Sequence, residues 1–285
     1  QLTCYKLFAV FIVGGFSMTT GIIEKSKKFG FSVVLFTTTF KVYSAINYSM
    51  EGNTLLRKKQ YETQKSNEIA KAIIINKIRN QRDILKKLRD TTIADGIINL
   101  DIQIDKLIRT KPDNYEIMGI EGISAKVYFN RLFKNLEWNG RQPRVKRDKI
   151  NLLMDIGYTV LFNYIEAILN IYGFDVYKGN LHKEFYKRKS LVCDIIEPFR
   201  PIVDYKIRKC MNLKQLDNYK YTIDNGQYHI DWKDGTHFML LILEAINEYK
   251  VQIFRYIQQY YRWVMKDKEI KDFPKVVLLN DSDKL

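Results

Sequence analysis

The residues most capable of metal chemistry gather in one stretch, His182–Asp204, which reads HKEFYKRKSLVCDIIEPFRPIVD. It holds one imidazole, His182, and two acids, Asp194 and Glu197, in an otherwise basic and apolar neighbourhood. An imidazole with carboxylates is an oxygen-rich donor set that suits Mn²⁺ or Mg²⁺ better than a structural zinc ion. Such a metal can stabilise a phosphodiester in transfer and activate an attacking oxygen. Taken alone, however, His182 is more simply read as an ordinary polar loop residue.

The residues from 191 onwards predict a helix that bends beside these acids. Asp194, Glu197 and Asp204 are spaced so that they share one face of that helix. Pro198 and Pro201 lack the backbone N–H that a continuous helix requires, so we expect a kink here. The other face carries the apolar residues Leu191, Ile195, Phe199 and Ile202, widened by Val192, Ile196 and Val203. A kinked polar edge on a buried helix is a candidate functional site.

Another acid, Glu121, lies among small residues in a predicted helix that Asp113 can cap. Gly119 and Gly122 flank it, with Ser124 close by. Glycine inside a helix costs roughly 0.5–1 kcal/mol, so two of them indicate that another backbone or a ligand comes close. From Glu121 alone, tight helix packing with the carboxylate in solvent is the simpler interpretation.

The segment WNGRQPRVKRDK, residues 138–149, is a candidate nucleic-acid contact. Cationic side chains at this density, next to an aromatic ring, suit a phosphate backbone with an unpaired base nearby. A solvated charged loop is the usual alternative. The predicted DNA-binding residues here are Arg141, Arg144, Lys146 and Arg147, and Lys187 and Arg188 join them from the basic run 183–189.

Composition points to a folded protein with a polyanionic partner. The 285 residues, 46% hydrophobic with 5 prolines, can bury a sizeable core in one large domain or two. The net charge of +15 favours nucleic acid or an anionic membrane surface, although a Lys-rich proteome would also give a basic surface. Cys4, Cys193 and Cys210 are too few for a disulfide framework, which fits a reducing cytoplasm. The apolar run Leu7–Phe16 is too short to cross a bilayer.

Hydrophobic periodicity predicts an α+β fold with two domains. Residues 1–50 form a β-rich N-terminal domain, with strands at Lys6–Val13, Ser32–Phe36 and Lys41–Ile46 and a helix at Thr19–Phe29. Residues 54–285 form a larger, mostly helical catalytic domain with a small hairpin at 219–231. Its longest expected helices are Thr54–Arg89, Thr92–Ile108, Asp148–Tyr172 and Gly235–Lys266.

Four segments, in order, resemble the CRISPR-associated spacer-acquisition integrase and endonuclease family. They are IMGIEGISAKVYF (117–129), RDKINLLMDIGYTVL (147–161), GFDVYKGNLH (173–182) and SLVCDIIEPFRPIVD (190–204). Four ordered blocks are much more specific than any single motif. Members of this family are nuclease-like subunits that insert new spacers into CRISPR arrays.

The resemblance implies roles for particular residues. Glu121 falls in the family block EG-x-x-A-x-x-Y, so the resemblance favours a functional role for this acid over the solvent-exposed one considered above. It implies that Glu121, His182 and Glu197 are the ligands of a Mg²⁺ or Mn²⁺ ion. Asp194 matches a nearby catalytic acid, and Arg200 and Tyr128 are supporting residues, with Arg200 placed to hold the Glu197 carboxylate. Glu197 stands where some relatives carry Asp, which preserves the type of ligand.

The resemblance also implies an activity and its partners. It implies a cytoplasmic homodimer that works with a small ferredoxin-like adaptation subunit on double-stranded DNA, the spacer precursor and the CRISPR repeat target. The nucleophile would be a DNA 3′-hydroxyl. Relative to the family, the first strands of the N-terminal domain are expected to be absent from this sequence. The alternatives are a structure-selective metal-dependent DNA nuclease and a non-catalytic basic scaffold that binds nucleic acid.

Overall fold

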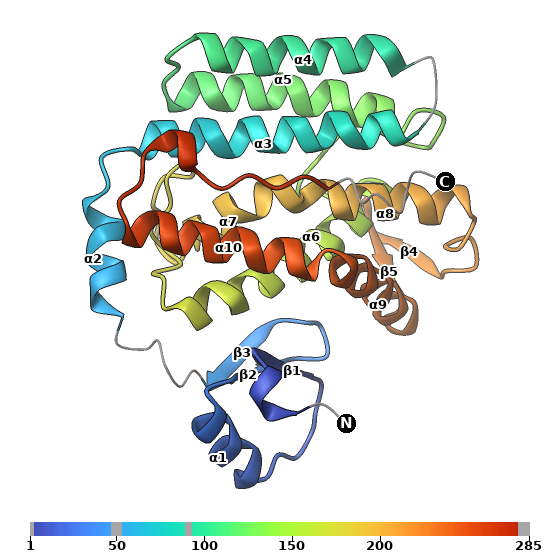
Figure 1. Ribbon diagram of the computed structural model, residues 1–285. Coiled ribbons are helices and arrows are strands. Elements are labelled where there is room, and N and C mark those ends of the chain that lie inside the picture. Colours follow the sequence, from blue (N-terminus) through green and yellow to red (C-terminus); the bar gives the residue numbers. More distant parts are fainter. Residues whose placement is uncertain (1–2, 47–52, 89–92, 279–285) are drawn as a thin grey trace.

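The structure is a computed structural model that describes residues 3–46, 53–88 and 93–278. A small sheet near the N-terminus is joined to a much larger body of helices (Figure 1). This confirms the predicted α+β class. The predicted boundary at residues 51–52 lies outside the described residues. Just after it, Asn53 accepts a hydrogen bond from the Leu56 N–H and caps the first helix of the body.

The sheet contains three strands in the described residues: β1 (Ala9–Val13), β2 (Ser32–Phe36) and β3 (Val42–Ile46). The central strand β2 pairs in parallel with β1, where Val10 lies opposite Val33, and antiparallel with β3. Helix α1 (Thr20–Phe29) connects β1 to β2, since a parallel pair needs a crossover and not a tight turn. The predicted start of the first strand at Lys6 is wrong, because Cys4–Lys6 form a short 3-10 turn, η1.

The helical body runs from α2 to a last short turn. Its elements are α2 (Thr54–Glu62), α3 (Ser66–Lys87), α4 (Ala94–Arg109), α5 (Asn114–Leu132), α6 (Lys149–Tyr172), α7 (Ser190–Ile196), the 3-10 turn η3 (Glu197–Phe199), α8 (Arg200–Asn212), the hairpin β4 (Tyr221–Asp224) and β5 (Gln227–Ile230), α9 (Trp232–Glu248), α10 (Lys250–Met265) and η4 (Ile270–Asp272). Asp113 and Asp148 cap α5 and α6 by accepting first-turn N–H groups, as their positions predict.

Two of the predicted long helices are each two helices. The expected helix 54–89 is interrupted after α2, where Thr63 is extended with φ −62° and ψ 128°. The expected helix 235–266 begins earlier, at Trp232, and breaks at Tyr249 between α9 and α10. Neither break follows a proline or glycine. Tertiary packing therefore ends these helices at points that local sequence does not mark.

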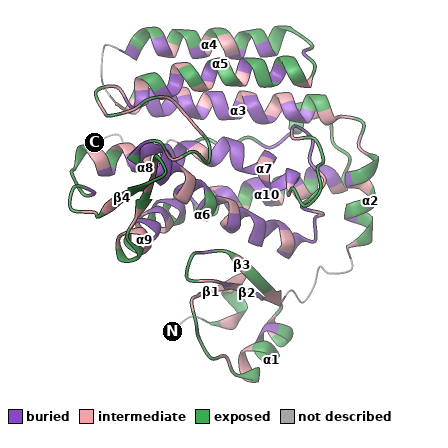
Figure 2. Ribbon diagram, turned by 180° about the vertical axis from the view of Figure 1, so that it is seen from behind, coloured by how far each residue is buried: buried purple, intermediate pink, exposed green. Residues whose placement is uncertain are grey.

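The body is layered around α3 and α6. Helices α3, α4 and α5 lie side by side as one layer, and α3 also contacts η3, α7 and α8 beneath it (Figure 1). Seen from behind, buried residues line α3 whereas exposed residues cover much of α4 (Figure 2). Helix α6 is apolar and long enough to cross a membrane by composition alone, but 72% of its most apolar window is buried within the fold, so it is interpreted as the core helix.

Aromatic contacts join the sheet to this body. The Phe11 ring on β1 meets Tyr164 of α6 with ring centroids 5.4 Å apart, and Phe8 meets Phe254 of α10 at 4.7 Å. Tyr256, Tyr260 and Trp263, also on α10, are buried. The aromatic residues of α10 therefore belong largely to the core and do not form an open platform for bases.

Candidate active site

Two acids from distant parts of the chain converge on one cation. The ammonium of Lys77, on α3, forms ion pairs with Oε1 of Glu121, on α5, and with Oε2 of Glu197, at 2.6 Å for the latter. The Lys77 side chain is 9% exposed and that of Glu197 is 5% exposed, whereas Glu121 is 28% exposed. Glu121 therefore lies at the mouth of the site and Glu197 at its base.

The predicted kink between α7 and α8 carries Glu197, the more buried of the two acids. Helix α7 ends at Ile196, a single 3-10 turn covers Glu197–Phe199, and α8 begins at Arg200. The Asn80 side-chain amide, on α3, donates a 2.8 Å hydrogen bond to the Pro198 carbonyl. This bond ties the turn to the helix that carries Lys77, so the two sides of the site are held together.

The charge on Glu197 is stabilised from two directions. Burial alone would raise the pKa of this carboxyl, but the positive charges of Arg200 and Lys77 outweigh it and lower the pKa to about 2. The Arg200 Nε donates to Glu197 Oε1 at 2.9 Å, so Arg200 lies where the sequence comparison places it. Burial would likewise lower the pKa of Lys77, and the attraction of Glu197 and Glu121 raises it instead.

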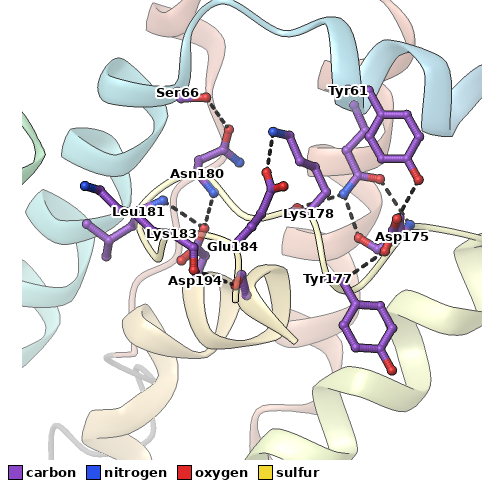
Figure 3. A network of polar contacts seen from close by, with 12 residues as sticks. Tyr61, Ser66, Asp175, Tyr177, Lys178, Asn180, Leu181, Lys183, Glu184 and Asp194 are labelled. Atoms are coloured by element: carbon purple, nitrogen blue, oxygen red, sulfur yellow. Dashed lines mark hydrogen bonds and ion pairs between the residues drawn. The ribbon is translucent and has the colours of Figure 1, made fainter. Parts of the chain in front are cut away.

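His182 is fixed by Asp194. The fully buried Asp194 carboxylate accepts backbone N–H bonds from Asn180 at 2.5 Å, Leu181 at 3.0 Å and His182 at 3.0 Å, and lies 2.7 Å from the His182 Nδ1. A proton on Nδ1 satisfies this contact and leaves Nε2 with a free lone pair. Asp194 thus orients the imidazole and fixes the backbone of residues 180–182; Figure 3 shows Asp194 beside Asn180 and Leu181.

A second set of contacts holds the loop that carries His182. Gln60, on α2, donates to the carbonyls of Asp175 at 2.7 Å and Lys178 at 2.9 Å, and Tyr61 donates to the Asp175 carboxylate at 2.5 Å. Ser66, on α3, donates to the side chain of Asn180 at 3.3 Å (Figure 3). Helices α2 and α3 therefore position a loop more than 100 residues further along the chain.

Of the three predicted ligands, the structure brings Glu121 and Glu197 together at Lys77, and it holds His182 through Asp194, three residues before Glu197. In the described residues, no three His, Cys, Asp or Glu side chains are close enough together to hold a metal as they stand. The Lys77 ammonium lies between the two carboxylates instead. Glu121 and Glu197 therefore already share one cation, the ammonium of Lys77.

A buried polar cluster lies behind Arg200. The Tyr158 hydroxyl donates to Asp204 Oδ1 at 2.5 Å, and the Arg200 guanidinium packs over the Tyr158 ring, 4.5 Å from its centroid. Burial raises the pKa of Asp204 to about 7. Tyr128 is fully buried beside this cluster, and burial together with the nearby Asp204 carboxylate raises the pKa of its hydroxyl.

The predicted DNA-binding residues divide into exposed and engaged side chains. Arg141 is engaged: its guanidinium donates to Asn151 at 3.0 Å and to Asp155 at 2.7 Å. Lys146 and Trp138 are half-buried, and Trp138 packs against Phe133 with ring centroids 5.0 Å apart. The exposed members of the set are Arg144, Arg147, Lys187 and Arg188.

Sequence reasoning missed Lys77. It shares a face of α3 with the buried residues Ala70 and Ile84, at two-turn spacing. A lysine that shares a helix face with Ile73, Ile74 and Ile84 is the signal that could have identified it, because lysine is almost never buried without a partner.

The fold is a small sheet followed by a helical body, in which Glu121 and Glu197 meet at Lys77 and Asp194 holds His182. Residues 1–240 match the family model described as CRISPR associated protein Cas1. The chain belongs to this family, and the match extends well beyond the four segments from which the resemblance was identified.

Known proteins agree with this assignment. The chain is 28% identical over 285 aligned residues to CRISPR-associated endonuclease Cas1 1 of Thermodesulfovibrio yellowstonii, covering 95% of this chain and 90% of that protein. It is 31% identical over 57% of its length to CRISPR-associated endonuclease Cas1 of Leptospira interrogans, and covers 71% of that protein.

Solved structures share the fold. The chain superposes on a partial Cas6-RT-Cas1–Cas2 complex with a TM-score of 0.80 at 22% identity, covering 96% of this chain and 89% of that one. It superposes on a casposase bound to an integration product with a TM-score of 0.72 at 21% identity, covering 92% and 84%. At these identities the likeness establishes the architecture.

Proposed function

We propose that this protein is a metal-dependent DNA integrase and endonuclease that inserts spacer DNA into CRISPR arrays by 3′-hydroxyl transesterification. The observation that carries the proposal is the convergence of Glu121 and Glu197 on one cation, with Glu197 three residues after Asp194, the carboxylate that holds Nδ1 of His182. The names of the relatives, as Cas1 endonucleases, and the structural likeness to a casposase bound to an integration product support it. So does the net charge of +15, which suits a DNA partner.

The donor types of the proposed ligands, two carboxylates and one imidazole, suit a divalent metal. Glu121, Glu197 and the free Nε2 of His182 would hold Mg²⁺ or Mn²⁺, which would supply charge stabilisation for the phosphodiester and activation of the attacking oxygen. Arg200 keeps Glu197 ionised and oriented, and Asp194 keeps the lone pair of His182 on Nε2. The exposed cations Arg144, Arg147, Lys187 and Arg188 would position the DNA backbone.

The proposal includes the partners that the family implies. The protein would act in the cytoplasm as a homodimer with a small ferredoxin-like adaptation subunit, on double-stranded spacer precursor and repeat DNA. Structural neighbours of the chain include Cas6-RT-Cas1–Cas2 complexes, which supports a partner protein.

A joining assay tests the proposal. With the small partner subunit and Mn²⁺ or Mg²⁺, short duplexes that end in a 3′-hydroxyl are expected to be joined to a repeat-containing target, and duplexes that end in a dideoxy nucleotide are not. Glu121→Ala and His182→Ala should abolish joining. Glu62→Ala is the matched control, because Glu62 is an exposed acid on α2.

The same assay separates the alternatives. Nicking that proceeds equally with blocked 3′ ends, and never gives joined product, would favour a simple structure-selective nuclease with water as the nucleophile. DNA binding without either reaction, unaffected by Glu121→Ala, would favour the non-catalytic scaffold.

A further inference from the structure

The proposed chemistry makes no use of Lys77, although Lys77 lies at the centre of the site. We propose that Lys77 is an internal counter-cation: its ammonium occupies the space between Glu121 and Glu197 in the metal-free protein and must turn away before a divalent metal can bind both carboxylates. Lys77 would thereby set the affinity of the site for metal. The inference rests on the proposed function only in assigning those two carboxylates as metal ligands.

The contacts of Lys77 show that its ammonium occupies the position that a shared metal would need. Its ammonium meets Glu121 Oε1 and lies 2.6 Å from Glu197 Oε2, which are the oxygens that would face a shared metal. Two cations cannot occupy the same place, and like charges held close together in a poorly solvated site repel strongly. Metal binding to both carboxylates therefore requires the ammonium to leave.

The surroundings of Lys77 show which part of it can move. Asn76, on the preceding position of α3, bonds the backbone of Val276 in both directions, at 2.7 and 2.9 Å. Asn80, one turn on, bonds the Pro198 carbonyl at 2.8 Å. The backbone of α3 is thus fixed on both sides of Lys77. Displacement has to occur by rotation of its flexible side chain, towards the mouth where Glu121 is more exposed.

Without metal, the ammonium has a structural role. It neutralises two carboxylates that would otherwise face each other across a buried site, where an unpaired charge is strongly unfavourable. Arg200 satisfies the other oxygen of Glu197 but, among the described residues, forms no ion pair with Glu121. Lys77 therefore links α3, α5 and η3 in the metal-free protein.

Metal affinity and thermal stability of Lys77→Met test the inference without any activity assay. Mn²⁺ binding, followed by the electron paramagnetic resonance signal of the free ion, should be at least about tenfold tighter in Lys77→Met than in the wild-type protein. Lys77→Met should also have a lower Tm in EDTA and a larger rise in Tm when Mg²⁺ is added. Lys86→Met is the matched control: it removes the same charge from an exposed position on α3 and should behave as wild type.

The wild-type protein gives a second measurement that does not depend on how the variant folds. The ammonium nitrogen of Lys77 should give a protected NMR resonance in the metal-free protein, and saturating Mg²⁺ should abolish or shift it. Unchanged Mn²⁺ affinity in Lys77→Met, or a Lys77 resonance that Mg²⁺ leaves in place, would overturn the inference and leave the proposed function standing. If neither the wild-type protein nor Lys77→Met binds metal, the inference about Lys77 and the proposed function are both wrong.

Discussion

At the scale of the residue, the site depends on side chains that orient others. Asp194 has no exposed surface and accepts hydrogen bonds from three successive backbone N–H groups as well as facing the His182 ring. Each of those partners is a donor, so a carboxylate satisfies all of them and an amide cannot. The role implied for Asp194 as a catalytic acid is therefore best understood as fixing the tautomer and direction of His182.

Asp194→Asn tests this role. The amide NH₂ would face N–H donors, the loop would shift, and Nε2 of His182 would lose its direction. We expect a loss of about 10–100-fold in Mn²⁺ affinity and in joining rate, as for other residues that orient a metal ligand. Titration calorimetry with Mn²⁺ measures the first effect, and Asp224→Asn, in the exposed turn of the hairpin, is the control. Full metal affinity in Asp194→Asn would contradict the assigned role.

Asp204 predicts a dependence of stability on pH. Burial raises its pKa to about 7 in the folded protein, against about 3.9 in an unfolded chain. Between these values the folded state binds more protons than the unfolded state, so this group makes the free energy of unfolding fall as pH rises from about 4 to about 7. Above that window its contribution is constant.

Asp204→Asn should remove this dependence. The amide keeps a partner for the Tyr158 hydroxyl but cannot ionise. Urea denaturation at pH 5 and pH 7.5 should show a smaller decrease in the free energy of unfolding for the variant than for the wild-type protein, by an amount of order 1 kcal/mol or more. The same decrease in both proteins would show that Asp204 is ionised throughout.

At the scale of the element, the loop between α6 and α7 requires glycine at position 179. A Cβ added to Gly179 would lie 2.7 Å from the Cβ of Ser190 and 2.9 Å from its backbone carbonyl carbon, on the first residue of α7. Backbone atoms cannot move aside cheaply. By contrast, a Cβ added to Gly122, on α5, would meet nothing within 4 Å.

Gly179→Ala should therefore lower the Tm and weaken Mn²⁺ binding, because the clash displaces the segment that leads to His182. Gly122→Ala is the control in the same protein and should raise stability by about 0.5–1 kcal/mol, the usual gain from replacing a glycine inside a helix. Thermal unfolding of both variants measures the difference. An unchanged Tm for Gly179→Ala would show that the loop relaxes freely.

Many of the helix boundaries could be predicted from the sequence, because the residues that mark them act locally. Asp113, Asp148 and Gly173 mark helix ends by their own side chain or backbone preference, and the structure places all of them at the caps. The Pro198 kink is of the same kind. The breaks near Thr63 and Tyr249 carry no such signal, because packing between distant segments decides them.

The candidate site was predictable only in part, and local signals did not suffice for it. Glu121, His182 and Glu197 could be identified only through the family resemblance, since each alone has a simpler interpretation. The role of Arg200 follows from its spacing three residues after Glu197. Lys77 and the engagement of Arg141 by Asp155 could not be predicted, because both depend on contacts between elements that the sequence does not place together.

The loop between α5 and α6 predicts a measurable salt dependence of DNA binding. Reversing Arg144 and Arg147 to Glu should weaken DNA affinity uniformly across sequences and flatten the log–log salt dependence by about 0.9 for each lost phosphate contact. Both side chains are exposed. Arg141→Glu should instead lower the Tm, because it places an acid beside Asp155. Fluorescence anisotropy across a salt series measures the slope of log affinity against log salt concentration. An unchanged slope would show that the loop does not contact the DNA backbone.

At the scale of the whole molecule, the sheet is the region most suited to self-association. In the described residues, β2 is paired on both sides, whereas β1 and β3 each have one unpaired edge. Tyr43 on β3 is 61% exposed, and Phe16, after β1, is 72% exposed. Exposed edges with aromatic side chains are surfaces that another strand or a second copy of the chain can cover. We therefore expect dimerisation through residues 1–48, of which the structure describes 3–46.

Tyr43→Lys tests this expectation. A charge on the β3 edge is a common device against edge-to-edge pairing, and lysine is the usual residue for it. Light scattering should give the mass of a dimer for the wild-type protein and shift towards the monomer for Tyr43→Lys. Leu240→Lys, which alters an exposed apolar residue on α9, should leave the dimer intact. A wild-type monomer at all concentrations, or a dimer that Tyr43→Lys leaves unchanged while Leu240→Lys dissociates it, would place self-association away from the sheet.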